Sequence, residues 1–542
     1  MEAMGERIDS RADNRTGDRM QEMKRLAETL REASRAYYAQ DREIMSNREY
    51  DRLYERLEEL ERIAVYGENV EVVEEAWERV RAARKLIFDL DKRGGAVYGL
   101  NRGVGWNKDK KVFAQFYDRY NRNLLRSHMI GVGPECSQEE VRAMLAVRLN
   151  GFLCGHTGVS EEIVEYYLEF INRGIHPIVK KRGSVGEADI GTLSGIGLVI
   201  IGEGEAWYAN ERMSGGEALK RAGLVPLLLG PKDGLGVVSS NAQGAAFAAL
   251  GLIEAKRFVE RYRCVFCLAL EGLNGVMDPM DETVNRERKF SGQIESAKKC
   301  REILKGSYLL EPSQERALQD PLSFRGQSAV TGAVTDALSY AERQLETELN
   351  STDDNPCLLP EEDRMCGSAN FEPLSWVLAV EMVSTGLAHM SKMIYQQLLR
   401  IGDPGFTKLN RFLTPEEGAV IAYGTIQKTF SCLDAENRMY AGPCSLDFLS
   451  MAGHIEDLAS NSTMVSCNMR KIIDNLYYMA AIELMHAAQA VDLRKPTSLG
   501  FGTGKLFEAY RRVVPFLEED RDLSCDIEKT YEFLKGYNTS KI

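Results

Sequence analysis

Two carboxylates, Glu187 and Asp189, follow a glycine-rich turn that begins Gly183-Ser184-Val185-Gly186 and runs into the apolar residues 196–201. Glycines that flank a turn let the backbone approach a ligand closely. A carboxylate placed there can act as a general acid, a general base or a ligand for a cation. We therefore predict that this turn is the centre of a catalytic or binding site, with Glu187 and Asp189 as its candidate groups.

A second glycine-rich stretch, residues 97–105, carries Tyr98 at its entrance, followed by Asn101 and Arg102. Three glycines within seven residues predict a loop there. A cation, Arg325, stands in another predicted loop just before a helix. An arginine in such a place holds a substrate carboxylate through two parallel hydrogen bonds, or it pairs with a structural acid. The residues alone leave both alternatives open.

Histidines and cysteines supply further candidates, each with an ordinary structural alternative. The acids of His454-Ile455-Glu456-Asp457 line a cleft between two long helices, or they form a charge cluster at a helix N-terminus. His486 lies in the middle of a predicted helix, where a core or interface position is the better interpretation. Cys264 and Cys267 form a Cys-x-x-Cys pair without a second pair or a nearby histidine for zinc, so we predict two core cysteines.

Long helices must position these residues. Residues 241–261, 329–349, 375–399, 416–440 and 464–493 are rich in Ala, Leu and Met and exceed the usual helix length. Several helices of this length predict a bundle, which other subunits can complete. Shorter helices are expected over residues 113–127 and 137–153, the second with Ser137 as its N-cap.

The fold class predicted from this pattern is mainly α. Residues 1–20 are predicted to be a disordered polar tail. Residues 21–225 are predicted to form an N-terminal lobe that contains the Tyr98 loop and the turn at 183–190, and residues 226–542 the long-helix bundle with the C-terminal helices. Within the lobe, residues 20–90 have the dense charge that is typical of a solvated helical hairpin.

The chain has 542 residues, enough to bury a large core, and carries a net charge of −13. This charge argues against a dedicated nucleic-acid binder, because no basic face would offset the repulsion. Eleven scattered cysteines and a charged N-terminus without an apolar signal region predict a reducing, cytoplasmic location. The longest fully apolar runs are too short to span a membrane, so we expect neither a membrane nor a nucleic acid as partner.

Eight short motifs follow one another along the chain. They are Tyr98-Gly99-Leu100-Asn101-Arg102-Gly103-Val104-Gly105, Asn123-Leu124-Leu125-Arg126-Ser127-His128, Gly183-Ser184-Val185-Gly186, Ile201-Gly202-Glu203-Gly204-Glu205-Ala206, Gln319-Asp320-Pro321, Asp354-Asn355-Pro356, Asn370-Phe371 and Glu483-Leu484-x-x-Ala487-Ala488-Gln489-Ala490. Together they resemble the aromatic amino-acid ammonia-lyases and aminomutases, and histidine ammonia-lyases in particular. The resemblance spans roughly residues 98–494. It implies a mainly helical fold of the ammonia-lyase, or fumarase/aspartase-like, type, a homotetramer with active sites drawn from several subunits, and a small amino-acid-like substrate.

The resemblance also implies roles for individual residues. Tyr98 matches the tyrosine that acts as the catalytic base, and Arg325 matches the arginine that holds the substrate carboxylate. Phe371 and Glu456 match residues of the substrate pocket. The pair Ser127-His128 matches the two residues that help to select the substrate side chain, in a form that looks closer to histidine lyases than to phenylalanine lyases.

The chain departs from the family where the family builds its electrophile. The family makes a methylidene-imidazolone ring from an Ala-Ser-Gly triplet directly after Gly-Ser-Val-Gly, whereas Glu187-Ala188-Asp189 follows here. No serine is present to dehydrate, and no glycine nitrogen to close the ring. Ser194-Gly195 lies further on, inside the apolar element, and is given little weight. We therefore predict that this prosthetic group is not formed and that no other cofactor is used.

Three further positions differ from the family. Ser239 stands where an asparagine is expected after Lys232-Asp233-Gly234-Leu235, and Leu322 stands where a tyrosine is expected after Gln319-Asp320-Pro321. Arg102 replaces a small residue in the Tyr98 loop. The changes gather at the electrophile while the base and the carboxylate clamp remain, which indicates a changed reaction rather than random decay.

The predicted function is that of a family enzyme, a carbon–nitrogen lyase, that works without the ring. Arg325 binds the carboxylate of an amino acid or its derivative, and Tyr98 moves a proton during elimination or addition. A tyrosine starts from a pKa of about 10, and Arg102 is the predicted cation that lowers it. Glu187 binds the amine, acts as a second acid or base, or forms a salt bridge with Arg102. The alternatives are a catalytically silent homologue that binds or assembles with an active enzyme, and a conventional ammonia-lyase or aminomutase whose ring forms by another route.

Overall fold

The computed structural model describes residues 56–539, so the predictions for residues 1–55 lie outside the described part. The chain divides into Met1–Glu59 and the compact unit Leu60–Ile542, which holds all of the candidate residues. Helix α3 (Arg56–Ala64) spans this division. The boundary expected near residue 225 lies within the larger unit and stays a prediction.

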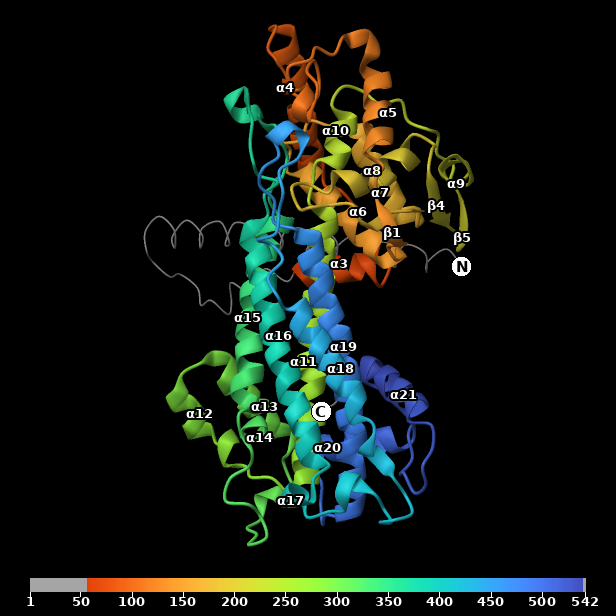
Figure 1. Ribbon diagram of the computed structural model, residues 1–542. Coiled ribbons are helices and arrows are strands. Elements are labelled where there is room, and N and C mark those ends of the chain that lie inside the picture. The colour runs from red at the N-terminus through yellow and green to blue at the C-terminus, as the bar shows by residue number, and fades with distance from the viewer. Residues whose placement is uncertain (1–55, 540–542) are drawn as a thin grey trace, which may run out of the picture. The chain divides into compact units, whose positions relative to one another are not determined.

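Long helices form the bundle of this unit, as the sequence predicts. They are α11 (Ala242–Leu273), α15 (Gln327–Leu349), α16 (Leu374–Ile401), α18 (Gln427–Tyr440) and α19 (Ser462–Arg494), and Figure 1 shows them side by side. Helix α11 packs most extensively on α19. Small residues permit this approach: a Cβ added to Gly272 would lie 2.9 Å from the Cβ of Ala490, and one added to Gly251 would lie 2.5 Å from Met469. The prediction of a mainly α fold with a long-helix bundle is confirmed.

One predicted helix forms only in its second half. Residues 416–440 were expected to be helical throughout, but α18 begins at Gln427. Ahead of it, the N–H groups of Ile421 and Ala422 donate to the carboxylate of Asp520, each at 2.8 Å, and Ala422 has a φ of 53°. A contact with a residue about a hundred positions away therefore replaces the helical hydrogen bonds, which local periodicity does not reveal.

Shorter elements make up the N-terminal part of the unit. The helices are α4 (Glu74–Lys92), α5 (Tyr117–His128), α6 (Gln138–Leu153), α7 (Glu161–Arg173), α8 (Ile190–Ile200), α9 (Gly215–Arg221) and α10 (Asp233–Val238). Strand β1 (Val132–Glu135) pairs with β3 (Lys180–Arg182), and β4 (Glu205–Tyr208) pairs with β2 (His176–Pro177) and β5 (Glu211–Ser214), all antiparallel. The predicted N-cap is confirmed, because Ser137 and Glu140 form a reciprocal capping box at the start of α6.

A short hairpin lies between α15 and α16 along the chain. Its strands β6 (Cys357–Leu359) and β7 (Arg364–Cys366) are antiparallel. Leu358 is buried in a cluster with α4 and with Val97 and Leu100, which flank Tyr98. The remaining helices are α12 (Glu282–Arg288), α13 (Ser291–Ile303), α14 (Leu322–Arg325), α17 (Pro404–Thr407), α20 (Phe501–Arg511) and α21 (Leu523–Gly536).

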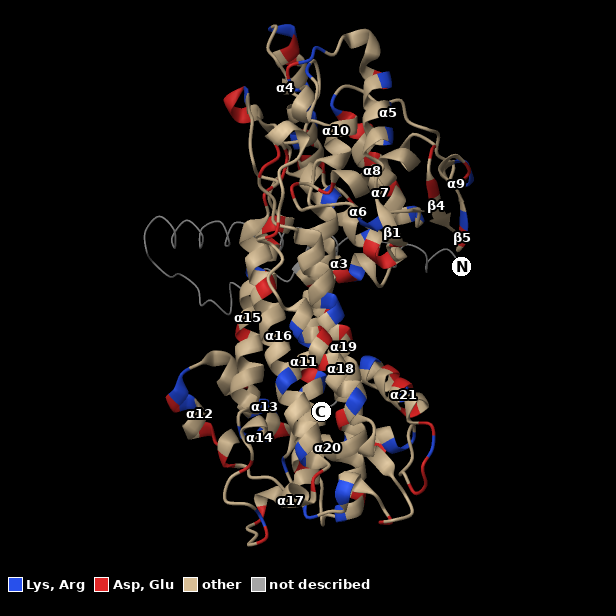
Figure 2. Cartoon of the chain, in the orientation of Figure 1, with Lys and Arg blue, Asp and Glu red and all other residues tan. Residues whose placement is uncertain are grey.

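Charged residues are interspersed along the described elements in the view of Figure 2, with Lys and Arg alternating with Asp and Glu. One helical stretch, Asp233–Leu273, is long and apolar enough to cross a membrane, but 89% of its apolar window is buried inside the protein. A core helix passes the same test of length and composition. Its place beside α19 in the bundle accounts for its apolar character.

A fully buried arginine fixes the start of the central helix. The Arg148 guanidinium donates to Asp354 at 2.9 Å and to Asp353 at 3.1 Å. Asp353 in turn accepts hydrogen bonds from the Ser240 hydroxyl at 2.7 Å and from the Asn241 N–H at 2.8 Å. The ion pair therefore holds the residues that lead into α11.

Replacing Arg148 tests this anchor. Arg148→Met leaves the buried Asp354 and the partly buried Asp353 without their cation, and losing one partner of a buried pair costs about 3–5 kcal/mol of unfolding free energy. We expect the urea midpoint to fall accordingly at fixed protein concentration. Arg93→Met, which removes the exposed pair with Asp363, is the matched control and should leave the midpoint unchanged. Equal effects of the two substitutions would contradict the anchor.

Candidate active site

Asp189 is a structural anchor of the glycine-rich turn. Its buried carboxylate accepts hydrogen bonds from the N–H groups of Gln243 at 2.9 Å and Gly244 at 3.0 Å, in the first turn of α11. The hydroxyls of Ser184 and Thr463 donate to its other oxygen at 2.5 and 3.0 Å. Burial raises the pKa of Asp189, and these hydrogen bonds oppose the rise. With both oxygens occupied, Asp189 binds α8, α11 and α19 together rather than a ligand.

Asn241 holds the turn in a left-handed conformation. Ala188 has a φ of 70°, and its N–H donates to the side-chain oxygen of Asn241 at 3.0 Å. The amide nitrogen of Asn241 donates to the carbonyl of Phe371 at 2.5 Å. Asn241 therefore joins the turn to the Phe371 loop. The sequence motif pointed to Ser239, which the structure places buried at the end of α10. The role of Asn241, two residues further on, was not predicted.

Glu187 faces other carboxylates. Burial raises its pKa to about 8, and the charge of Glu456 and a hydrogen bond to Glu456 add to the rise, followed by the charges of Glu372 and Asp457. Ionising Glu187 beside Glu456 would bring two negative charges together, so Glu187 keeps its proton to a higher pH than an isolated carboxyl group. The gathered carboxyl groups make this a site that a positive charge would favour.

The Tyr98 hydroxyl lies beside this pair. It accepts a hydrogen bond from the Gly105 N–H at 2.6 Å. Burial raises the pKa of Tyr98, the Gly105 N–H lowers it, and the charge of Glu456 raises it again. A Cβ added to Gly105 would lie 3.5 Å from the Glu456 carboxylate, which places Tyr98, Glu456 and Glu187 in one cluster.

Two loops that are distant in sequence pack together to form this cluster. Trp106, in η1 (Gly105–Asn107), lies so close to Gly453, in η8 (Ala452–His454), that a Cβ there would be 2.7 Å from its ring. Glu456 follows η8 and is six residues short of the start of α19 at Ser462. Residues 454–457 therefore do not lie at the N-terminus of α19, and their place in a cleft stays a prediction.

Arg102 does not have the effect predicted for it. Its guanidinium donates to the Asn101 carbonyl at 3.0 Å, and the Asn101 side chain donates to Asp91 at 2.7 Å and shapes the loop. The pKa of Tyr98 is raised rather than lowered, chiefly by burial, and the charged group that acts on it is Glu456. Glu187 has its close electrostatic partners in Glu456, Glu372 and Asp457, and the described residues show no ion pair between Glu187 and Arg102.

Ser127 and His128 close α5 near the turn. The Ser127 hydroxyl and the His128 Nδ1 are 3.2 Å apart, and both contact the Leu124 carbonyl. The chain that follows packs on the glycine-rich stretch, since a Cβ added to Gly183 would lie 2.9 Å from the Cα of Gly131. The pair Ser127-His128 therefore ends three residues before Gly131, which contacts the turn directly.

Arg325 and Leu322 lie at the other end of the bundle. Their helix α14 places Phe324 against Phe266 of α11, with ring centroids 6.1 Å apart. Phe266 lies 24 residues after Ala242, about 36 Å along α11 at 1.5 Å per residue. Figure 1 shows α14 toward the opposite end of the bundle from α8 and α10. One chain therefore gathers Tyr98, Glu187, Glu456 and Phe371 at one end and leaves the predicted carboxylate clamp at the other.

The Arg325 guanidinium has a hydrogen-bond donor that no described residue accepts from. Its Nη1 donates to Gln319 at 2.7 Å, and its buried Nε has no hydrogen-bond partner within the described residues. Leu322, on the same short helix, is 73% exposed.

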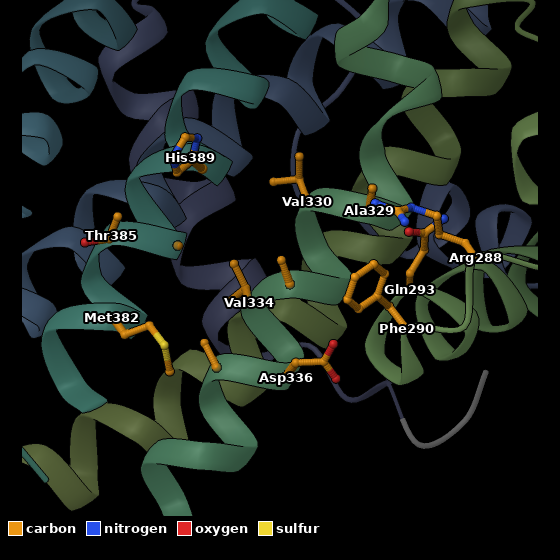
Figure 3. Close-up of a pocket in the computed structure, with 13 residues that line it drawn as sticks. Arg288, Phe290, Gln293, Ala329, Val330, Val334, Asp336, Met382, Thr385 and His389 are labelled. Carbon is orange, nitrogen blue, oxygen red and sulfur yellow. The ribbon is translucent and has the colours of Figure 1, made fainter. Parts of the chain in front are cut away.

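A large cavity lies elsewhere, between α13, α15 and α16, with a volume of about 750 Å³. Figure 3 shows Val330 and Val334 of α15 facing Met382 and His389 of α16 across it. None of the predicted site residues lines it, and its lining surface is mostly apolar. The cavity is therefore separate from the Tyr98 cluster.

Two structural predictions are confirmed. His486 is buried in α19, contacts the Ile482 carbonyl at 2.8 Å, and burial lowers its pKa to about 4. Cys264 and Cys267 are buried in α11, as expected of core cysteines.

A bundle of long helices with a tyrosine and carboxylates at one end agrees with the ammonia-lyase type of fold that the sequence motifs predict. The chain belongs to the aromatic amino acid lyase family, whose model matches residues 56–512. Histidine ammonia-lyase of Natranaerobius thermophilus is 32% identical over 481 residues, 88% of this chain and 95% of the relative. The resemblance drawn from the sequence motifs is confirmed.

Solved structures agree with this assignment. The ergothioneine-degrading enzyme ergothionase of Treponema denticola, solved in complex with desmethyl-ergothioneine sulfonic acid, is 50% identical with a TM-score of 0.86, over 88% of this chain and 96% of that one. Phenylalanine aminomutase of Pantoea agglomerans is 28% identical with a TM-score of 0.84, over 88% and 96%. The fold prediction is confirmed by both.

The N-terminal residues match a second model. Residues 16–66 are similar to the DNA ligase-like, N-terminal NAD+-binding domain. Most of this range lies outside the described residues. The prediction for this range was a tail and part of a solvated helical hairpin, and this similarity was not predicted.

The carboxylate pair can be tested through the pH dependence of stability. The pKa of Glu187 is about 8 in the folded protein and 4.5 ordinarily, so its contribution stabilises the fold at low pH and is lost as the pH rises through this window. Glu456→Gln removes a charge that raises this pKa. We expect the variant to lose less stability than the wild type between about pH 5 and pH 8.

Urea midpoints at the two pH values give the measurement. Glu417→Gln, at an exposed carboxylate, is the control and should lose as much stability as the wild type. If Glu456→Gln behaves like this control, the two carboxylates are not coupled.

Proposed function

We propose that this protein eliminates a cationic amine from an amino-acid-derived carboxylate without the family's prosthetic ring. One observation carries the proposal: two neighbouring carboxyl groups, Glu187 and Glu456, lie beside the Tyr98 hydroxyl. Negative charge of this density suits a substrate nitrogen that is permanently positive. The family membership supports a lyase that acts on amino acids.

The residues at the turn do not fit a ring made from the chain itself. Glu187-Ala188-Asp189 contains no serine, and the Asp189 carboxylate is fully used as an anchor. Ser194 is buried inside α8, where its hydroxyl donates to the Ile190 carbonyl at 2.7 Å. A reaction without this electrophile needs a substrate whose nitrogen leaves readily.

Tyr98 supplies the base in this proposal. Its oxygen takes the proton from the substrate carbon β to the carboxylate, the C–N bond breaks, a C=C bond forms, and the amine departs as a neutral molecule. A raised pKa makes the phenolate a strong base, and a bound cation favours the phenolate over the phenol. The Gly105 N–H, which already donates to this oxygen, holds the anion in place.

A trimethylammonium acid is the substrate class that this arrangement favours. A quaternary nitrogen cannot lose its charge by deprotonation, and it leaves as trimethylamine without help from an electrophile. Ergothioneine, a trimethylammonium betaine with a thiolated imidazole ring, belongs to this class, and an enzyme that degrades it is 50% identical to this chain. We therefore propose ergothioneine or a closely related histidine betaine as the substrate.

A second copy of the chain completes the site in this proposal. Within one chain, about 36 Å of α11 separates the Asn241 end of the bundle from Phe266, which lies against the neighbour of Arg325. An Arg325 that clamps the substrate carboxylate must then come from another subunit. The homotetramer implied by the family resemblance provides such neighbours.

Substrate preference tests the proposed reaction. We expect the purified protein to release trimethylamine and a conjugated, ultraviolet-absorbing acid from ergothioneine or histidine trimethylbetaine. Its kcat/KM for the better betaine should exceed that for histidine by at least about a hundredfold. Ammonia release from histidine at a higher kcat/KM would indicate a conventional ammonia-lyase. Binding of the betaines without any product would indicate a silent homologue.

Mixed subunits test both the base and the shared site. Tyr98→Phe and Arg325→Met should each lower kcat/KM by about 10²–10⁴, whereas Tyr120→Phe, a half-buried neighbour of Tyr98, is the matched control and should retain activity. Co-expression of the two inactive variants in equal amounts should restore about a quarter of the wild-type sites, because base and clamp then combine from different chains. If confirmed mixed oligomers recover no activity, Tyr98 and Arg325 of each site come from the same chain.

A further inference from the structure

Two cysteines face each other at the base of the β6–β7 hairpin. Cys357 and Cys366 are Cα partners in the antiparallel ladder, and both are free and half-buried. Side chains directly opposite each other in a ladder lie on the same face of the strands. Leu358 and Met365 occupy the opposite face and pack on the core cluster with α4.

The register places the two cysteines at a separation suited to a disulfide. The Leu358 N–H donates to the His156 carbonyl at 3.0 Å, and the Leu358 carbonyl contacts the His156 ring at 2.6 Å. These backbone groups point away from β7, so Leu358 and Met365 form a non-hydrogen-bonded pair and the adjacent pair, Cys357 and Cys366, is a hydrogen-bonded one. Such pairs have Cα atoms about 5.5 Å apart, which is within the commonest range for disulfides.

The surroundings of the two sulfurs differ. Arg364 donates from its guanidinium to the Cys366 Sγ at 2.7 Å, and a cation in this position favours a reactive thiolate. Burial raises the pKa of Cys357, and the charges of Asp354 and Cys366 add to the rise while Lys232 opposes it. Cys366, which has the cation beside its sulfur, is therefore the nucleophile of the pair, and Cys357 is the thiol opposite it in the ladder.

We propose that Cys357 and Cys366 are a peroxide-reactive pair that forms a reversible disulfide across the base of the hairpin. The Cys366 thiolate attacks a hydroperoxide, the O–O bond breaks, and a sulfenic acid and an alcohol or water form. The Cys357 thiol then attacks this sulfur, the S–S bond forms, and water leaves. The two thiols together lose two electrons and two protons to the peroxide, and a dithiol reductant reverses the step.

The two cysteines lie close in sequence to Asp353 and Phe371, two residues that hydrogen-bond to Asn241. Asp353, four residues before Cys357, accepts a hydrogen bond from the Asn241 N–H at 2.8 Å. Phe371, five residues after Cys366, accepts one from the Asn241 side chain. A disulfide would close the chain between these two anchors of Asn241.

Peptide mapping of the full-length protein tests the proposal, because trypsin cleaves after Arg364, between the two cysteines. After treatment with equimolar hydrogen peroxide and alkylation, we expect peptides 344–364 and 365–392 to be joined, with a loss of about 2 Da that dithiothreitol reverses. Cys432 and Cys525, which are exposed, are the internal controls and should remain alkylated in most molecules.

Variants separate the two roles. In Cys357→Ser, Cys366 should stop at the sulfenic acid and be trapped by dimedone, whereas in Cys366→Ser the Cys357 thiol should stay reduced. Arg364→Gln should slow formation of the disulfide by about tenfold, and Arg364→Lys should restore most of the rate. The proposal is overturned if the joined peptides are absent while Cys432 or Cys525 is oxidised, or if Cys366→Ser leaves the reactivity of Cys357 unchanged.

Discussion

The buried carboxylate of Asp189 is the interaction on which the rest of the site depends. It joins the glycine-rich turn to the first turn of α11 and to Thr463 of α19, the two helices that pack most extensively in the bundle. A buried charge is tolerated only where hydrogen bonds satisfy it, and here each oxygen accepts two. This anchor leaves the residue two positions earlier, Glu187, facing Glu456 and its neighbouring carboxyl groups.

Like charges gathered at one place are the second constraint. Glu187 and Glu456 lie together beside a buried tyrosine, and the charge of Glu456 adds to the rise in the pKa of Glu187 that burial causes. A positive charge bound between them would offset this repulsion. In the proposed chemistry, this negative site takes the place of the family's electrophile and selects a substrate that does not need one.

The parts of this site that could be predicted are those that local sequence motifs mark, whereas its long-range contacts could not be predicted. Tyr98 and Glu456 were predicted from short motifs, and the structure brings them together through Trp106 and Gly453. The role of Asn241 was missed because the motif pointed to Ser239. The predicted effect of Arg102 on the pKa of Tyr98 was wrong, because burial is the largest cause of that shift and cannot be read from the sequence.

The bundle was predictable from helix length and composition, whereas its interruptions were not. Hydrogen bonds to Asp520 replace helical ones in the first half of residues 416–440. The distance between Arg325 and the Tyr98 cluster depends on the length of α11 between them, which the motifs do not show. The most direct test of the central claim is the mass of active enzyme, intact and over residues 183–205. If elimination proceeds without the ring, protein that releases trimethylamine will have the mass of its unmodified sequence. A deficit of two waters on that peptide would contradict the account.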